Sequence, residues 1–461
     1  MTEVLAAPDV SVVDEFKGRL RGELIRPDDA GYEEARTVYN AMIDRRPALI
    51  ARVANVADVI SAVNFARDHH LRLAIRGGGH GVAGFGTCDG GLVIDLGRMR
   101  GIRVDPEHRI LRAEGGCTWG DVNHAAHAFG FATTGGLVST TGIAGLTLGG
   151  GIGYLSRMCG LSCDNLLSAD VVTADGRFLT CNAERENALF WALRGGGGNF
   201  GVVTSFEFRL HPVGEIYGGP LFFPLEGSVL RGFREWIRQV PERMGAGLGL
   251  TLAPPLPFLP ETWHGKPVAA LIPCWAGAPE EGEEMLKPVR DWAEVLGAFV
   301  GRLPYPVINT LFDEALPKGL QNYWKTNFVR EITDEAIEVH LKHAARTPSV
   351  ESSLFFLPID GACHRVGAEE TAFGSREARF ASLVSGAWRD PADNERNVRW
   401  VREYDEALRP YSEAGGYVNF MSYDDQMKVR ASYGRNYDRL VEVKRKYDPA
   451  NLFRLNQNVA P

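Results

Sequence analysis

The chain has 461 residues, of which 45% are hydrophobic and 23% charged, and its 50 Lys and Arg against 58 Asp and Glu give a net charge of −8. This composition is typical of an ordinary soluble globular protein of two or more domains. The acidic balance without a basic block argues against a nucleic-acid partner. The lack of any apolar run of about 18 residues argues against a membrane span.

The N-terminal sequence and the cysteines bear on the cellular compartment. The opening residues, MTEVLAAPDVSVVDEF, are acidic and lack the basic start and apolar core of a secretory signal. The seven cysteines are scattered and odd in number, which does not fit a disulfide framework. We therefore expect a cytoplasmic protein with reduced thiols.

The first half of the chain predicts short strands and helices in irregular alternation. Helices are predicted at 56–69, 119–130 and 186–195, single strands at 71–75, 92–96 and 201–210, and hairpins at 101–116 and 169–181. The Asp175-Gly176 dipeptide is the strongest turn signal among them. This half is therefore of the α+β class.

Glycine is the compositional anomaly, because 29 of the 53 glycines lie between Gly77 and Gly201. The strand at 71–75 runs into Arg-Gly-Gly-Gly-His-Gly, residues 76–81. Successive bare N–H groups form a nest that binds anions, most often phosphate. The sequence therefore predicts a phosphate cradle, in which His80 is a candidate ligand, base or nucleophile.

Two stretches match the pattern G-x-G-x-x-G, at 79–84 and at 196–201. Neither precedes a helix, as a Rossmann dinucleotide site requires, since the first runs into FGTCDGG and the second into a strand. A further glycine-rich segment at 135–165 is either a set of tight loops or a second wall of the same cofactor site. Two such segments in one domain favour the second interpretation.

Beyond residue 212 glycines become sparser, and a second domain is expected over 214–414. Its strands are predicted at 268–277, 322–329, 352–359 and 378–388, with a helix at 334–345. The C-terminal segment 437–459 is predicted to be a basic amphipathic helix followed by a loop. The histidine pairs 124/127 and 340/343 lack acidic or cysteine partners at ligand spacing, so no metal site is expected.

Four segments carry a resemblance that covers nearly the whole chain. They are, in chain order, RGGGHGVAGFGTCDGGLVIDL, TTGIAGLTLGGGIGYLSRMCGLSCDNLLSADVVTADG, ALFWALRGGGGNFGVVTSFEFRLHP and YDPANLFRLNQNV. Together they resemble the FAD-linked oxidases of the vanillyl-alcohol oxidase superfamily, in the branch of berberine bridge enzyme and 6-hydroxy-D-nicotine oxidase. The resemblance implies a two-domain FAD-binding fold of the α+β class. It also implies a FAD domain made of 1–213 and 415–461, and an antiparallel substrate sheet in 214–414 with helices on its far side.

The resemblance further implies that the glycine loop binds the FAD pyrophosphate and that His80 is bonded covalently to the flavin. A second link through cysteine, present in many members, is not expected, because Val138 occupies the matching position. The implied cofactor-binding residues are Arg76, Gly77, Gly78, Gly79, His80, Gly81, Ser139, Thr140, Thr141, Gly142, Gly145, Gly151, Gly153, Asn165, Val203, Tyr417 and Asn419.

The expected reaction is hydride transfer from an alcohol, an amine or an activated ring carbon of a small molecule to the flavin, followed by reoxidation by O2 to H2O2. The resemblance places Thr141 beside the flavin at a position that controls access of O2 in relatives, and its small side chain favours an oxidase. A dehydrogenase with another electron acceptor, an oxidative cyclase and a flavin-binding protein without turnover remain alternatives. Two observations distinguish these alternatives. A flavin-binding protein is not reduced by any donor, and a dehydrogenase is reduced by its donor but reacts slowly with O2.

The identity of the catalytic base is a separate question, because relatives carry a tyrosine where this chain has Phe420. One candidate group is Tyr423 with the adjacent Asp424 and Asp425. The other is the pair Tyr323 and Lys325, which share one face of the predicted strand. The competing interpretation is that Tyr323 only packs and Lys325 only pairs with a carboxylate.

Overall fold

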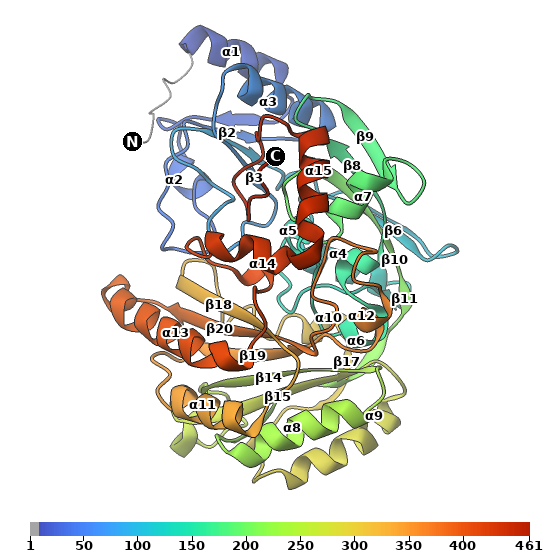
Figure 1. Ribbon diagram of the computed structural model, residues 1–461, viewed down its shortest axis with the longest axis vertical. Helices are drawn as coiled ribbons and strands as arrows, with labels where there is room; N and C mark the ends of the chain where they lie inside the picture. Colours follow the sequence, from blue (N-terminus) through green and yellow to red (C-terminus); the bar gives the residue numbers. More distant parts are fainter. Residues whose placement is uncertain (1–8) are drawn as a thin grey trace.

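The protein is described by a computed structural model over residues 9–461 and contains three larger sheets and a two-stranded one. The first two larger sheets lie in one half of the molecule and the third in the other half (Figure 1). The first sheet has the order β1-β2-β4-β3. Its strands are β1 (Glu23–Ile25), β2 (Leu49–Arg52), β3 (Leu73–Arg76) and β4 (Leu92–Asp95). The neighbours β2, β4 and β3 are parallel, whereas β1 is antiparallel to β2.

Helix α3 (Val56–Asp68) connects β2 to β3 and begins where Asn55 accepts a hydrogen bond from the N–H of Asp58. Helix α1 (Val10–Arg19) packs on α3 through the stacked rings of Phe16 and Phe65, whose centroids are 4.1 Å apart. The predictions of a helix at 56–69 and of strands at 71–75 and 92–96 are therefore confirmed within a few residues.

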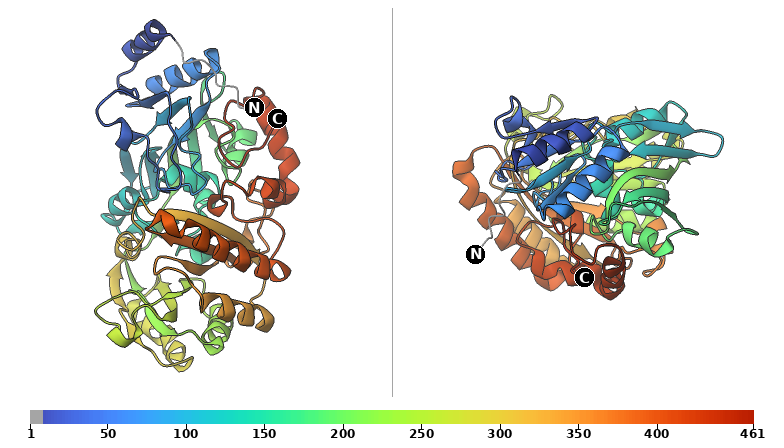
Figure 2. Two further views of the ribbon diagram at one scale, coloured as in Figure 1. Left: turned by 90° about the vertical axis from the view of Figure 1, so that its left-hand side faces the viewer. Right: turned by 90° about the horizontal axis from the view of Figure 1, so that it is seen from above.

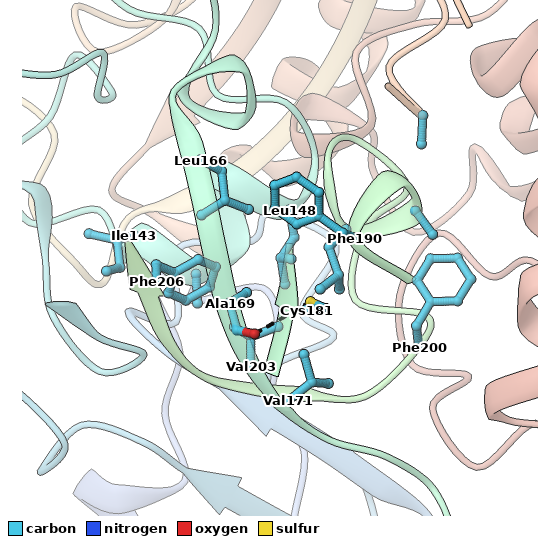
Figure 3. Close-up of a cluster of buried hydrophobic side chains, with 14 of the residues drawn as sticks. Ile143, Leu148, Leu166, Ala169, Val171, Cys181, Phe190, Phe200, Val203 and Phe206 are labelled. Atoms are coloured by element: carbon cyan, nitrogen blue, oxygen red, sulfur yellow. Dashed lines mark hydrogen bonds between the residues drawn. The ribbon is translucent and has the colours of Figure 1, made fainter. Parts of the chain in front are cut away.

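The second sheet is antiparallel throughout and has the order β5-β6-β10-β8-β9. Its strands are β5 (Ile102–Asp105), β6 (Ile110–Glu114), β8 (Leu166–Val172), β9 (Phe178–Asn182) and β10 (Val202–Arg209). Figure 3 shows its buried core, in which Phe206 and Leu166 from the strands meet Phe190 of α7 (Asn187–Leu193). Both predicted hairpins and the predicted helix at 186–195 are confirmed.

Short helices and strands join this second sheet to the rest of the molecule. They are α4 (Trp119–His127), α5 (Ile143–Leu148), α6 (Ser156–Cys159), and the strands β7 (Phe131–Ala132) and β11 (His211–Pro212), which pair with each other. The short α2 (Tyr32–Ala35) lies between β1 and β2 of the first sheet. Helix α4 starts with a reciprocal capping box between Thr118 and Asp121. It ends at His127, three residues before the glycine that the sequence suggested as its end.

The third sheet has nine strands and is antiparallel in every pairing. Its central order is β16-β13-β15-β14-β19-β20-β18, and β12 and β17 adjoin it beside β15. The strands are β12 (Glu215–Gly218), β13 (Leu221–Pro224), β14 (Met244–Leu252), β15 (Pro267–Trp275), β16 (Gly297–Ala298), β17 (Gly301–Pro304), β18 (Gln321–Val329), β19 (Ser353–Pro358) and β20 (Phe380–Trp388). All strands predicted in the second half are therefore confirmed.

The long helices cover one face of the nine-stranded sheet (Figure 1). They are α8 (Gly227–Gln239), α11 (Asp334–Ala344) and α13 (Asn394–Leu408), with the shorter α9 (Pro279–Leu286) beside them. Phe233 of α8 and Trp400 of α13 pack into the core on this side. The short α10 (Tyr305–Ile308) and α12 (Ala362–Arg365) lie on the opposite face, where they contact α4 and α6. The opposite face of the sheet points toward the first two sheets.

Strand β14, at the centre of this sheet, was not predicted, because three glycines alternate along it. A Cβ on Gly245 would lie 1.8 Å from the carbonyl oxygen of Tyr154. A Cβ on Gly247 or Gly249 would lie within 3.0 Å of the ring of Phe355. The glycines therefore allow Phe355 to lie flat against the sheet and bring the first half of the chain into close contact with it.

The C-terminal segment returns to the first two sheets. Helices α14 (Val429–Tyr433) and α15 (Tyr437–Tyr447), red in Figures 1 and 2, pack against the core of the second sheet. The contacts are made by Tyr433, Leu440 and Tyr447. The fully buried Lys444 is neutralised by Asp448, with Nζ and Oδ2 2.7 Å apart. The predicted C-terminal helix is confirmed.

Candidate active site

A cavity of about 370 Å³ begins between the first two sheets. It extends to the face of the third sheet that lies opposite the long helices. At one end it is lined by Leu73 of β3 and Val203 of β10. At the other end it is lined by Trp324 of β18, Phe355 of β19 and Leu383 of β20. The cavity is therefore long and crosses the boundary between the two halves of the fold.

The glycine loop, residues 77–81, lines the middle of the cavity. None of its five backbone N–H groups donates a hydrogen bond to another group within residues 9–461. Its neighbour is Gly142, and a Cβ on Gly78 would lie 2.3 Å from the nitrogen of that residue. The close approach of two side-chain-free loops leaves adjacent, unpaired donors that suit the diphosphate of a dinucleotide.

His80 ends this loop inside the cavity and is held on three sides. Its Nε2 lies 3.0 Å from Oγ1 of Thr140, and its Nδ1 lies 3.4 Å from Oγ1 of Thr141. The ring of Tyr39 stacks on the imidazole with centroids 4.4 Å apart. Burial lowers the pKa of His80 to about 4, so the imidazole is neutral at pH 7 and keeps one nitrogen lone pair available.

Three phenols also line the cavity, those of Tyr39, Tyr417 and Tyr433. Tyr417 is buried, and its hydroxyl oxygen accepts hydrogen bonds from the N–H of Gly151 at 2.9 Å and from Nδ2 of Asn419 at 2.8 Å. Burial raises the pKa of Tyr417 and of Tyr39 to about 12. Both phenols therefore stay protonated at neutral pH, where they can donate hydrogen bonds but are weak bases.

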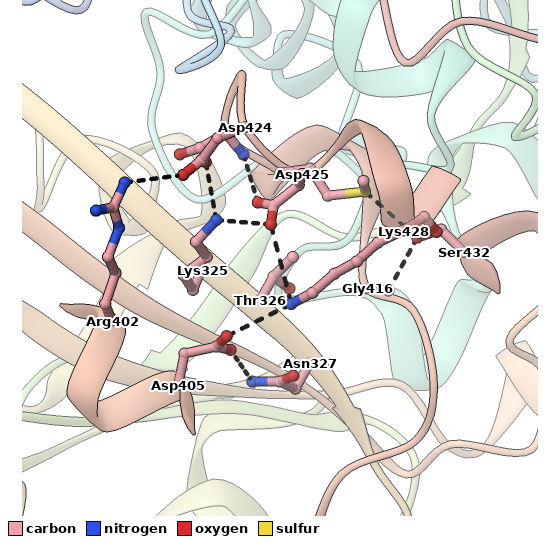
Figure 4. A network of polar contacts seen from close by, with 12 residues as sticks. Lys325, Thr326, Asn327, Arg402, Asp405, Gly416, Asp424, Asp425, Lys428 and Ser432 are labelled. Atoms are coloured by element: carbon pink, nitrogen blue, oxygen red, sulfur yellow. Dashed lines mark hydrogen bonds and ion pairs between the residues drawn. The ribbon is translucent and has the colours of Figure 1, made fainter. Parts of the chain in front are cut away.

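The structure places Tyr323 and Lys325 away from this cavity. They share one face of β18, as predicted, but Trp324 between them is the residue that faces the cavity. Lys325 Nζ lies 2.8 Å from Asp424 and 2.6 Å from Asp425 (Figure 4). The Tyr323 hydroxyl donates to Asp424 at 2.6 Å. These two candidates therefore belong to a buried polar network.

The charges in this network are mutually neutralised. Burial opposes the charge on Lys325, but its bonds to the two carboxylates outweigh burial and raise its pKa, so it holds its proton at neutral pH. Arg402 of α13 joins the network through Asp424, 3.2 Å away (Figure 4), and through the Tyr323 hydroxyl, 3.0 Å away. Tyr423 lies at the edge, half exposed, with its ring centroid 6.4 Å from that of Tyr323.

The network anchors the segment that forms one wall of the cavity. Asp425 accepts from the N–H of Ser422 at 3.0 Å, and the Ser422 hydroxyl bonds to both backbone groups of Trp324. Directly before it, the turn Val418–Phe420 lines the cavity. The arrangement joins the C-terminal segment to β18.

The residues implied as cofactor-binding fall into two groups. Those that line the cavity are Arg76, Gly77, Gly78, Gly79, His80, Gly81, Thr141, Gly142, Gly145, Val203, Tyr417 and Asn419. Those that the structure does not bring to it are Ser139, Thr140, Gly151, Gly153 and Asn165.

The second group has other local roles. Asp313 accepts from the backbone and hydroxyl of Ser139, and a Cβ on Gly153 would lie 1.7 Å from the oxygen of Gly135. The amide of Asn165 donates to the carbonyl of Cys159 at 2.9 Å. Thr140 faces a neighbouring polar cavity of about 550 Å³ on the other side of the glycine loop, which Arg76 and His80 also line.

Several cavity residues carry no motif and were missed by sequence reasoning. They are Phe312 and Leu316 of the loop before β18, Trp324, Ser353, Phe355, Leu383 and Ser385. Alternation along each strand gives two possible faces, and only the tertiary packing decides which one meets the cavity.

Three further observations concern the cysteines, the metal-ligating side chains and the helices of the described chain. All seven cysteines lie in the described part of the chain and are unpaired, and Val138 lines the cavity where no cysteine does. From residue 9 onward, no group of three or more His, Cys, Asp or Glu side chains is arranged to hold a metal ion. Over the same range, no helix combines the length and apolarity needed to cross a bilayer.

Comparison with known proteins identifies the parts of the chain that form the cavity. Residues 47–182 match the family described as FAD binding domain, and residues 416–460 match the family described as berberine and berberine like. The first range contains the glycine loop and His80, and the second contains Tyr417 and Asn419.

Full-length relatives give the same result. The chain is 30% identical over 457 residues to a FAD-linked oxidoreductase of Dictyostelium discoideum, covering 98% of this chain and 97% of that one. It is 31% identical over 463 residues to (R)-6-hydroxynicotine oxidase of Paenarthrobacter nicotinovorans, covering 96% and 97%.

Among solved structures, 6-hydroxy-D-nicotine oxidase of Arthrobacter nicotinovorans matches with a TM-score of 0.86 and 28% identity, over 96% of this chain and 98% of that one. Glucooligosaccharide oxidase of Acremonium strictum, at 22% identity and a TM-score of 0.86, over 98% of this chain and 99% of that one, shares the fold. The chain is therefore a FAD-linked oxidoreductase of the vanillyl-alcohol oxidase superfamily and belongs to its branch of berberine bridge enzyme and 6-hydroxynicotine oxidase.

Proposed function

We propose that this protein is an oxidase that removes hydride and a proton from a small molecule and passes the two electrons and two protons to O2, which becomes H2O2. The observation that carries the proposal is a cavity that joins the glycine loop to the face of the third sheet opposite the long helices. A 6-hydroxynicotine oxidase, similar to this chain along nearly its full length in both sequence and structure, is an oxidase by name.

The cavity residues fit FAD. The free N–H groups of residues 77–81 suit the diphosphate, and the apolar end at Leu73 and Val203 suits a planar base. Bound FAD supplies a ring that accepts hydride and returns electrons to O2. The chain's own part is to exclude water, hold the substrate against that ring and keep the reacting atoms in line.

We also propose that the cofactor is attached through His80 alone. A neutral imidazole is nucleophilic, and the low pKa of His80 keeps it neutral at physiological pH. The hydroxyls of Thr140 and Thr141 orient the ring by bonding its two nitrogens. Val138 offers no sulfur for a second link.

The use of O2 is supported by Thr141, which lines the cavity beside His80 and leaves room for a diatomic molecule. We propose a FAD domain made of 1–213 and 415–461 and a substrate domain over 214–414, consistent with the sheet boundaries at Arg209 and Glu215. The seven unpaired cysteines support a reducing compartment such as the cytoplasm.

Two measurements test the proposal. After acid precipitation, flavin should remain with the protein and its peptide should contain His80 and no modified cysteine. Under anaerobic conditions a donor should bleach the flavin absorbance, and air-saturated buffer should then restore it with formation of H2O2. Reoxidation no faster than that of free reduced flavin would indicate a dehydrogenase, and a flavin that no donor reduces would indicate a binding protein.

A further inference from the structure

The cavity face of the third sheet has a simple chemical pattern. Alternation places Ser353 and Phe355 of β19, and Leu383 and Ser385 of β20, on the face that lines the cavity. Leu354, Phe356 and Val384, at the alternate positions, point into the core beneath the helices. The cavity face is thus apolar except for two serines.

The two serines are direct neighbours. Ser353 pairs with Ser385 across β19 and β20, and Ser385 pairs with Trp324 across β20 and β18. Directly opposed residues in an antiparallel pair hold their Cβ atoms about 5 Å apart. Neither serine hydroxyl bonds to another side chain or backbone group within the described chain. Two free hydroxyls therefore project side by side into an otherwise apolar space.

Aromatic rings enclose this space on two sides. Phe312 meets Phe355 edge to face, with centroids 5.8 Å apart, and Trp324 meets Phe420 in the same way at 5.9 Å. Among the residues that line the cavity, Arg76 is the only one with a permanent charge, and it lies at the glycine loop, paired with Asp95. Within residues 9–461, no carboxylate or ammonium group lines the cavity beside the serines.

We infer that the substrate of this protein is an uncharged, largely aromatic small molecule with one hydroxyl or carbonyl oxygen, and that Ser353 and Ser385 determine its orientation by hydrogen-bonding that oxygen. The inference rests on the proposed function, because it places the substrate at the sheet end of the same cavity. Rings of the substrate pack between Phe355 and Trp324.

The same lining discriminates against two other substrate classes. An ammonium group would be buried without a carboxylate partner, and a carboxylate would lack a cation. A sugar carries many hydroxyls, of which the serine pair satisfies one, and each hydroxyl left unpaired lowers affinity about 5- to 150-fold. Uncharged aromatics with a single oxygen fit both the shape and the polarity of the space.

Calorimetric titration of the purified holoprotein at pH 7 tests the inference without any turnover. The probes are 3-ethylphenol, ethylbenzene, benzylammonium, benzoate and cellobiose. The expected result is that 3-ethylphenol binds most tightly and ethylbenzene about 2- to 12-fold more weakly, since one hydrogen bond separates them. Tighter binding of cellobiose, benzoate or benzylammonium than of 3-ethylphenol would overturn the inferred class.

The variants Ser353→Ala, Ser385→Ala and the double variant identify the residues responsible. In the double variant 3-ethylphenol should bind no more tightly than ethylbenzene, while ethylbenzene affinity stays unchanged. The matched control is Ser382→Ala, since Ser382 lies in the same strand but bonds Asn327 away from the cavity. An unchanged preference for 3-ethylphenol in the double variant would refute the role of the serines.

The design separates this inference from the proposed function. Binding heats do not depend on flavin reduction, so a protein that binds 3-ethylphenol but is reduced by no donor would leave the inference standing and defeat the oxidase proposal. A protein whose covalent flavin is reduced by cellobiose and reoxidised by O2 would do the reverse.

Discussion

Replacing Lys325 by Met separates the two interpretations of the buried network. Lys325 is 7% exposed and contacts Asp424 and Asp425, and removing one partner of a buried ion pair costs about 3–5 kcal/mol. The low end applies here, because Asp424 keeps Arg402 at 3.2 Å and Asp425 keeps Lys428 at 3.9 Å. We therefore expect a loss of about 3 kcal/mol.

The unfolding entropy of a chain of this length is about 1 kcal/mol/K, so Lys325→Met should lower Tm by about 3 °C. Lys325→Arg, which keeps the charge, should lose less. The matched control is Lys428→Met, because the Lys428 side chain is 37% exposed and the loss should be below about 1 kcal/mol. Differential scanning calorimetry of the three holoproteins measures these shifts.

The anaerobic reduction rate decides the function of Lys325. If the network only anchors the C-terminal segment, Lys325→Met and Tyr323→Phe should be reduced within a few-fold of the wild-type rate. Loss of a general base typically costs about 10²–10⁴-fold. A Lys325→Met protein with unchanged Tm and a rate reduced by that factor would refute the structural interpretation and make Lys325 the base.

Three further predictions follow from the site and the core. The rate of covalent FAD attachment to apoprotein should vary less than about twofold between pH 5.5 and 8, because a pKa of about 4 keeps His80 neutral throughout. An ordinary histidine pKa would make the rate fall about tenfold at pH 5.5, and such a fall would contradict the neutral imidazole. Thr141→Leu should slow reoxidation of the reduced protein by O2 more than its reduction by substrate, measured by rapid mixing, and equal slowing would exclude a role in oxygen access. Burial lowers the pKa of His340 to about 3, so the unfolded chain binds more protons and stability should fall as pH drops below about 6.5; denaturant titrations should show a shallower fall for His340→Asn, and an identical fall would mean that His340 is not the group that titrates.

Local patterns predicted much of the fold. Helix α3, both hairpins of the second sheet and the strands β15, β18, β19 and β20 of the third were evident from periodicity and turn residues. Strand β14 was not predicted. Its three alternating glycines are required by close contacts with Tyr154 and Phe355, which lie far away in the chain. These glycines are needed for a tertiary contact, and the sequence around them does not indicate that contact.

The candidate site shows the same division. The anion-binding loop at 77–81 was predicted from the sequence, because consecutive glycines by themselves indicate a close approach of the backbone to a ligand. The shared face of Tyr323 and Lys325 was also predicted, but not that Trp324 takes the cavity side, because period-two alternation does not say which face is inward. Ser353 and Ser385 belong to the same class of residues, whose role depends on their neighbours across the sheet.

The way the cavity is assembled has a consequence for biosynthesis. Its walls combine the glycine loop near residue 80 with Tyr417, Phe453 and Gln457 close to the end of the chain. Translation reaches Tyr417 long after it has produced the glycine loop, so the cavity cannot close before the segment that contains Tyr417 has emerged from the ribosome. If FAD is attached through His80 as proposed, a nascent chain stalled before residue 417 should therefore be made without covalent flavin.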